Sequence, residues 1–216
     1  MIMFDIIRSK EESDRVTDFV AIGNIVRNGK STHAAFVIQY EKVLYEFHYT
    51  STSVELSEII GDYYHKITET ISPDEVPAFI AYCKNIQKNA NPVYGYFYSG
   101  ESYDLNGKHV AESGLGEIMT CVGFCLNVLK GFLEEEYLVF SEWNAETHDS
   151  IGYLESFCEY HGVDPSKIAD SHRRITPREC LASCFFHDLP IPKQKIEDKL
   201  VEVDQFFSNR LCISNN

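Results

Sequence analysis

The chain of 216 residues carries 19 Lys and Arg against 33 Asp and Glu, a formal net charge of −14 at pH 7 with neutral histidine. Hydrophobic residues make up 44% and aromatic residues 13% of the chain, which excludes an intrinsically disordered protein. A surface this acidic repels phosphate backbones and anionic headgroups, so nucleic acids and membrane surfaces are not expected as partners. The length fits a single domain over residues 1–216, with residues 145–216 as a helical C-terminal extension.

The N-terminal residues and the cysteines bear on the compartment. Asp5, Arg8 and Lys10 interrupt the segment where a secretion signal would need an unbroken apolar core. No uncharged apolar run approaches the roughly 20 residues that span a bilayer, so no membrane span is expected. Seven cysteines form an odd set without the tight spacing of a disulfide scaffold. The sequence therefore predicts reduced thiols and a cytoplasmic protein.

Three β-rich runs follow one another near the N-terminus. Residues 18–26 are mainly apolar and β-branched, and a polar, Gly-containing turn separates them from the runs 33–39 and 42–49. This pattern predicts a three-stranded antiparallel meander whose second turn lies around residues 40–41. Because side chains alternate along a strand, Glu46 and His48 share one face of the third strand.

Two amphipathic helices follow the strands. Residues 72–88 open with Ser-Pro-x-Glu, a capping box with proline at the first helical position, and then carry apolar residues at helical spacing. Residues 118–132 have apolar side chains along one broad side, and Thr120 is a suitable N-cap. The second segment is therefore predicted to be a buried helix that begins near Cys121.

The C-terminal third is predicted to be mainly helical. A short strand at residues 136–140 precedes helices at about 148–161, 177–187 and 195–210, the second of which opens with a Thr-Pro-x-Glu capping box. The order of strands, helix, loop, buried helix, strand and helical tail predicts an α+β domain whose antiparallel sheet packs against the buried helix.

Cys121 is the candidate nucleophile of the chain. A helix N-terminus stabilises a thiolate, because its unpaired N–H groups and the helix dipole favour negative charge. A base and an orienting acceptor must stand nearby. His33, across the predicted hairpin from residues 46–48, supplies the base, and either Glu46 or His48 supplies the acceptor.

These segments resemble a known superfamily of cysteine enzymes. His33 opens a strand and is followed by AAFVI, Glu46 stands within LYEF at nearly the usual spacing, and Cys121 opens the helix TCVGFCLNVLKG. The order of these elements resembles the circularly permuted branch of the NlpC-type, papain-like cysteine peptidases and amidases. That branch includes the YiiX-like hydrolases and the lecithin retinol acyltransferase relatives. Val122 departs from the pattern, since many relatives have serine there.

The resemblance implies a fold and an activity. The fold would be permuted papain-like, and the activity would be hydrolysis of an amide or ester bond in a small molecule or peptide through a thioester acyl-enzyme, without cofactor or metal. Cys121 would be the nucleophile, His33 the base and Glu46 the orienting residue, while His48 could take the role that histidine fills in the acyltransferase branch. Two alternatives remain open: a thiol acyltransferase, and a non-catalytic binding or regulatory protein on the same fold.

Cysteine and histidine also occur together at spacings that suit zinc. A structural zinc site is therefore an alternative interpretation, weaker than the cysteine hydrolase. The pairs are Cys158 with His161, and Cys180 and Cys184 with His187. The paired C-x-x-C knuckles of typical zinc sites are absent, so buried core is the simpler interpretation of these cysteines. Four other histidines lie in polar contexts and are expected to face solvent: His65, His109, His148 and His172.

Overall fold

The structure is a computed structural model of the whole chain. It describes residues 5–11, 17–95, 100–111, 116–143, 151–162, 164 and 173–213, with the backbone alone at 151–154, 161 and 211–213.

A six-stranded antiparallel sheet forms the centre of the molecule, in the strand order β1-β6-β2-β3-β4-β5. Its strands are β1 Ile7–Arg8, β2 Phe19–Arg27, β3 Lys30–Tyr40, β4 Val43–Tyr49, β5 Val54–Glu58 and β6 Tyr64–Ile67. The predicted meander corresponds to β2, β3 and β4 and is confirmed. The strands β5 and β6 extend it, and β6 returns to pair with the free edge of β2.

Two-residue turns set the register of the central hairpins. Asn28 and Gly29 have φ angles of 49° and 74°, and Glu41 and Lys42 have φ angles of 50° and 69°. Left-handed backbone at both turn positions matches the twist of antiparallel strands. The β3–β4 turn therefore lies one residue later than predicted.

Five α-helices are described: α1 Val76–Asn89, α2 Cys121–Leu133, α3 Ile151–His161, α4 Pro177–Ser183 and α5 Lys193–Ile213. Three 3-10 turns accompany them: η1 Ser9–Glu11, η2 Pro73–Glu75 and η3 Phe140–Glu142. Two short ribbons complete the fold: β7 Val93–Tyr94 pairs with β10 Ile118–Met119, and β8 Ser102–Tyr103 pairs with β9 His109–Val110. The structure is therefore of mixed α+β type.

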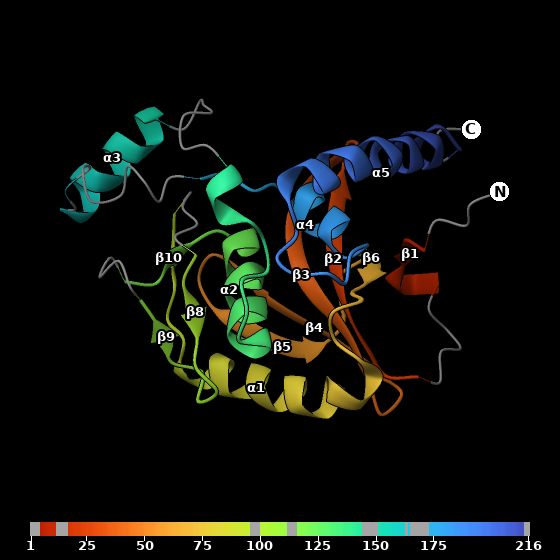
Figure 1. Cartoon of the computed structure of the whole chain (residues 1–216), viewed down its shortest axis with the longest axis horizontal. Helices are drawn as coiled ribbons and strands as arrows, with labels where there is room; N and C mark the ends of the chain where they lie inside the picture. Colours follow the sequence, from red (N-terminus) through yellow and green to blue (C-terminus); the bar gives the residue numbers. More distant parts are fainter. Residues whose placement is uncertain are drawn as a thin grey trace.

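The main core lies between the helices and one face of the sheet. Figure 1 shows α2 running past the strands, with α1 along one end of the sheet and α4 and α5 at the other. Phe36 and Phe47 project from neighbouring strands, and the Phe47 ring packs edge-on against Phe124 of α2 at 5.2 Å. Residues 122–129 of α2 are all buried, as the sequence predicts. The same core holds α4 and the inner side of α5.

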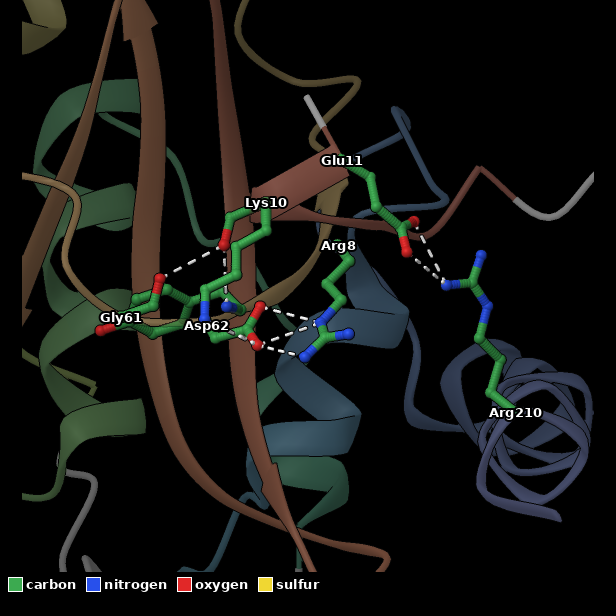
Figure 2. A network of polar contacts seen from close by, with 8 residues as sticks. Arg8, Lys10, Glu11, Gly61, Asp62 and Arg210 are labelled. Carbon is green, nitrogen blue, oxygen red and sulfur yellow. Dashed lines mark hydrogen bonds and ion pairs between the residues drawn. The ribbon is translucent and has the colours of Figure 1, made fainter. Parts of the chain in front are cut away.

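A smaller apolar cluster covers the other face of the sheet, where Tyr63 packs against side chains of β2 and β3. The loop between β5 and β6 is held there by the N-terminal segment. Figure 2 shows Arg8 pairing with Asp62 beside Gly61, and Glu11 accepting a hydrogen bond from Arg210 of α5 at 3.1 Å. The N-terminal segment therefore connects this loop to the last helix.

Local sequence signals located most helices correctly. The capping boxes of the helices that open at Pro73 and Pro177 are present, and Thr120 caps α2. The predicted strand at 136–140 is wrong: only Leu138 forms a β-bridge, to Ile191, and a 3-10 turn starts at Phe140. The part of the predicted helix 148–161 that precedes Ile151 lies outside the described residues. No helix in the described ranges is long and apolar enough to cross a membrane.

Candidate functional site

Cys121 is the first residue of α2, and its position follows from local sequence. Thr120 has extended backbone, and its hydroxyl accepts a hydrogen bond from the amide of Gly123 at 3.1 Å, which ends the preceding strand and starts the helix. The Cys121 side chain remains partly exposed, whereas Cys125, one turn later, is fully buried as predicted. Cys121 is therefore the cysteine of α2 that a reagent can reach.

Two opposing effects act on the Cys121 thiol. Burial raises its pKa above the usual value, while the backbone groups of Ala34, Val122 and Cys121 itself hydrogen-bond to sulfur and act in the opposite direction. Burial dominates, so the thiol is protonated at neutral pH. Deprotonation of Cys121 during a reaction would therefore need a base nearby.

His33 forms a pair with His48. The Nε2 atom of His33 lies 2.9 Å from Nδ1 of His48, and the two rings meet edge to face. Burial lowers the pKa of His33 to about 4, and the neighbouring His48 and Arg27 act in the same direction. Burial also lowers the pKa of His48, although Glu46 and Glu55 oppose the shift. Both imidazoles are therefore neutral at pH 7.

The surroundings of the pair select its tautomers. Nε2 of His48 lies 4.0 Å from the carboxylate of Glu55, which favours a proton on that nitrogen. Nδ1 of His48 is then the acceptor, and Nε2 of His33 is the donor of the 2.9 Å hydrogen bond. This assignment leaves Nδ1 of His33 without a proton, which is the state that a general base requires.

A cavity of about 390 Å³ is lined by Cys121 and His33 together with Thr32, Tyr49 and Tyr94. Within the described residues, no hydrogen bond links the His33 ring directly to the Cys121 sulfur. The candidate nucleophile Cys121 and the candidate base His33 are therefore lining residues of one cavity, without a hydrogen bond between the ring and the sulfur. Catalytic hydrogen bonds are often longer before a substrate binds.

Glu46 lies on the same strand face as His48 but contacts other groups. Its carboxylate oxygens accept hydrogen bonds from the amides of Ile60 and Gly61 at 3.3 and 3.2 Å. Burial and this neighbouring carboxylate raise the pKa of Tyr63. The structure therefore places Glu46 as an anchor of the β5–β6 loop and brings His48, rather than Glu46, to His33.

A second cavity shares Cys121 with the first. It has a volume of about 280 Å³, and its lining residues include Cys121, Thr32 and Tyr94 from the first cavity. Arg173 and Arg174, which precede α4, also line it. Sequence reasoning did not single out these arginines, although their position directly before the capping box of α4 was a usable signal.

Two histidines lie elsewhere than expected. His65 is buried, and the rings of His65 and Phe19 stack at 5.8 Å. His109 is also largely buried and lies 2.9 Å from Glu101, so the expectation that these two histidines face solvent is wrong. His148 and His172 lie outside the described residues.

The candidate zinc ligands near α4 differ in their exposure to solvent. Cys180 and Cys184 are fully buried, whereas the side chain of His187 is 70% exposed. Within the described ranges, no group of three or more His, Cys, Asp or Glu side chains is arranged to hold a metal ion.

Comparisons of the chain with models of protein families, with curated proteins and with solved structures find no match in any of the three.

Proposed function

We propose that the chain is a cysteine hydrolase that cleaves an amide or ester bond, on an arrangement that resembles the permuted papain-like fold. Cys121 is the nucleophile, His33 is the base, and His48 is the positioning residue that holds the His33 ring. The observation that carries the proposal is that the only partly exposed thiol of α2 and a neutral histidine line one cavity.

The reaction runs in two steps. Nδ1 of His33 takes the proton from the Cys121 thiol as sulfur attacks the substrate carbonyl, and the same proton passes to the leaving amine or alkoxide. A thioester between Cys121 and the acyl group results. Water then attacks the thioester with His33 as base, which releases the acid and returns the proton to sulfur.

The start of α2 supplies electrostatic support for this chemistry. Backbone N–H groups at a helix N-terminus stabilise negative charge, and in this proposal the amide of Cys121, the first residue of α2, donates to the oxyanion. His48 accepts the Nε2–H of His33 in the resting state and continues to accept it when His33 is protonated. The hydrogen bond between the two histidines therefore persists through the proton transfer without any rearrangement of the pair.

Acylation of the thiol by an activated ester tests the proposal. We expect p-nitrophenyl acetate to acetylate Cys121 faster than free cysteine at the same pH, with mass spectrometry locating the acetyl group. His33→Gln should slow this step by about 100-fold, the lower range of general-base effects. Cys158→Ser, a thiol substitution on α3, should behave as the parent protein does.

Two results would overturn the proposal. Acetylation of Cys121 no faster than that of free cysteine would leave the non-catalytic binding protein as the better interpretation. An unchanged rate in His33→Gln would remove the base from the mechanism.

A thiol acyltransferase is the second candidate, and the His33–His48 pair favours it. The resemblance assigns histidine to the orienting position in the acyltransferase branch, and the structure has His48 in contact with His33. The chemistry of the first step is the same, but a second nucleophile replaces water. Added amines or alcohols should then accept the acetyl group from Cys121 at a rate above that of hydrolysis.

A further inference from the structure

The cavity that joins Cys121 to Arg173 and Arg174 has an unusual charge for this protein. The chain carries a formal net charge of −14, yet no Asp or Glu is among the described residues that line this cavity. A strongly acidic protein repels anions at long range. A locally positive cavity next to the thiol attracts anions despite the negative charge of the whole protein.

The two arginines also differ from three other arginines of the chain. Within the described residues, neither Arg173 nor Arg174 lies within 4.0 Å of a carboxylate. Three arginines elsewhere are paired, as Arg8–Asp62, Arg178–Asp204 and Arg210–Glu11. The charges of Arg173 and Arg174 are therefore not neutralised by the carboxylates that the structure describes.

Arg173 is held in place by groups that leave its charge available. Its guanidinium carbon lies 4.0 Å above the ring centre of Phe140, and one terminal nitrogen donates to the Phe140 carbonyl at 2.7 Å. Its Nε atom is buried and has no hydrogen-bond partner among the described residues. Arg174 is exposed beside it. A guanidinium that stacks on an aromatic ring and is not neutralised by a carboxylate can bind an anion through its remaining terminal N–H groups.

We propose that this cavity binds the carboxylate of a compact anionic acyl substrate, whose scissile carbonyl then lies at Cys121. The inference rests on the proposed function and deepens it by naming the substrate class. Ligand cavities commonly measure about 300–1,000 Å³, so a cavity of about 280 Å³ suits a small dicarboxylic or amino-acid-derived acyl group rather than a long acyl chain. Arg173 and Arg174 determine specificity, whereas His33 performs the proton transfer.

Two alkylating reagents of nearly equal size test the charge of the cavity without any substrate. Iodoacetate carries a carboxylate, and iodoacetamide is its neutral analogue. We expect the rate ratio of iodoacetate to iodoacetamide at Cys121 to exceed that of free cysteine at least about threefold, because the arginines attract the anion. Arg174→Gln should return the ratio toward that of free cysteine.

The matched control is Arg210→Gln, which changes the net charge by the same unit on α5, outside the lining of this cavity. It should leave the ratio unchanged. Arg173→Gln is the second cavity variant. This substitution also removes the packing of Arg173 on Phe140, a loss that Arg174→Gln avoids. A parent ratio at or below that of free cysteine would overturn the inference, and so would an equal fall of the ratio in Arg210→Gln.

Protection of Cys121 from iodoacetamide identifies the anion. Glutarate should slow the alkylation, whereas its neutral diamide should not. Protection by inorganic phosphate but not by glutarate would overturn the assignment to a carboxylate. These outcomes are separate from the proposed hydrolase function: a carboxylate preference can persist in His33→Gln even if that variant shows that His33 takes no part in catalysis.

Discussion

Nε2 of His33 and Nδ1 of His48 lie 2.9 Å apart, and this contact holds the His33 ring against the neighbouring strand β4. The two residues are 15 positions apart in the chain, on neighbouring strands of one hairpin. A hydrogen bond to one ring nitrogen fixes the tautomer and orientation of the other. The pair therefore determines which nitrogen of His33 is free to accept a proton.

His48 and Glu46 can be compared directly as orienting residues. We expect His48→Ala to lower the rate of Cys121 acetylation by about tenfold or more, because the His33 ring loses its only described side-chain hydrogen bond. Rescue by His48→Asn, whose side chain can still accept, would mark a positioning role rather than general destabilisation.

Glu46→Gln is the complementary substitution. The amides of Ile60 and Gly61 lose a charged acceptor, so we expect lower stability by about 1–2 kcal/mol in urea unfolding and a nearly unchanged acetylation rate at Cys121. A large fall in the rate with unchanged stability would instead restore Glu46 to the orienting role that the sequence predicted.

The pH dependence of Cys121 alkylation should distinguish a neutral pair from an ion pair. Burial raises the pKa of the Cys121 thiol and lowers the pKa of His33 to about 4, so sulfur keeps its proton at neutral pH. We expect the rate of alkylation by iodoacetamide to rise with pH through the alkaline range, with a midpoint above that of an ordinary cysteine. A plateau of fast alkylation between about pH 5 and 7 would show a thiolate–imidazolium pair instead.

Parts of this site that depend on neighbouring residues in the sequence could be predicted, whereas parts that depend on tertiary contacts could not. The position of Cys121 was predictable because the N-cap Thr120 and the apolar spacing of α2 are local features. The partner of His33 was not, because both Glu46 and His48 lie within reach on the same strand face. The choice between them depends on the β5–β6 loop, where the amides of residues 60 and 61 bind Glu46.

The limits of the fold prediction have a similar physical cause. The strand β6 carries Tyr64, His65 and Lys66 in succession, so it lacks the apolar alternation that marked β2 and β3. Its pairing with β2 buries His65 and Lys66 by tertiary contact alone. Conversely, the residues around Leu138 have strand-like composition, but they form one isolated β-bridge, to Ile191, instead of a strand.

Acid should destabilise the protein through His33. The pKa of His33 is lowered to about 4 in the folded chain, so between about pH 6.5 and 4 the unfolded chain binds a proton that the folded chain does not. The free energy of unfolding therefore falls as pH falls through this range, by up to roughly 3 kcal/mol from this group. Urea unfolding at several pH values should show a shallower fall for His33→Asn. Parallel curves for the two proteins would contradict the assignment.

Gly131 should be intolerant of a side chain although it lies within a helix. A Cβ atom at this position would overlap the carbonyl oxygen of Tyr103 and the hydroxyl of Tyr82, which donates to that carbonyl at 2.9 Å. Helix propensity alone predicts that Gly131→Ala stabilises α2 by about 1 kcal/mol. Overlap with backbone instead predicts destabilisation by about 1–3 kcal/mol.

The sign of the change in the free energy of unfolding decides between the two effects at Gly131. Thermal or urea unfolding measures it, and Gln87→Ala at an exposed position of α1 serves as the control for helix propensity without overlap. We expect Gly131→Ala to be less stable than the parent, because the β8 backbone cannot move away without breaking the Tyr82 hydrogen bond. A gain in stability would mean that β8 does not pack closely against α2 in solution.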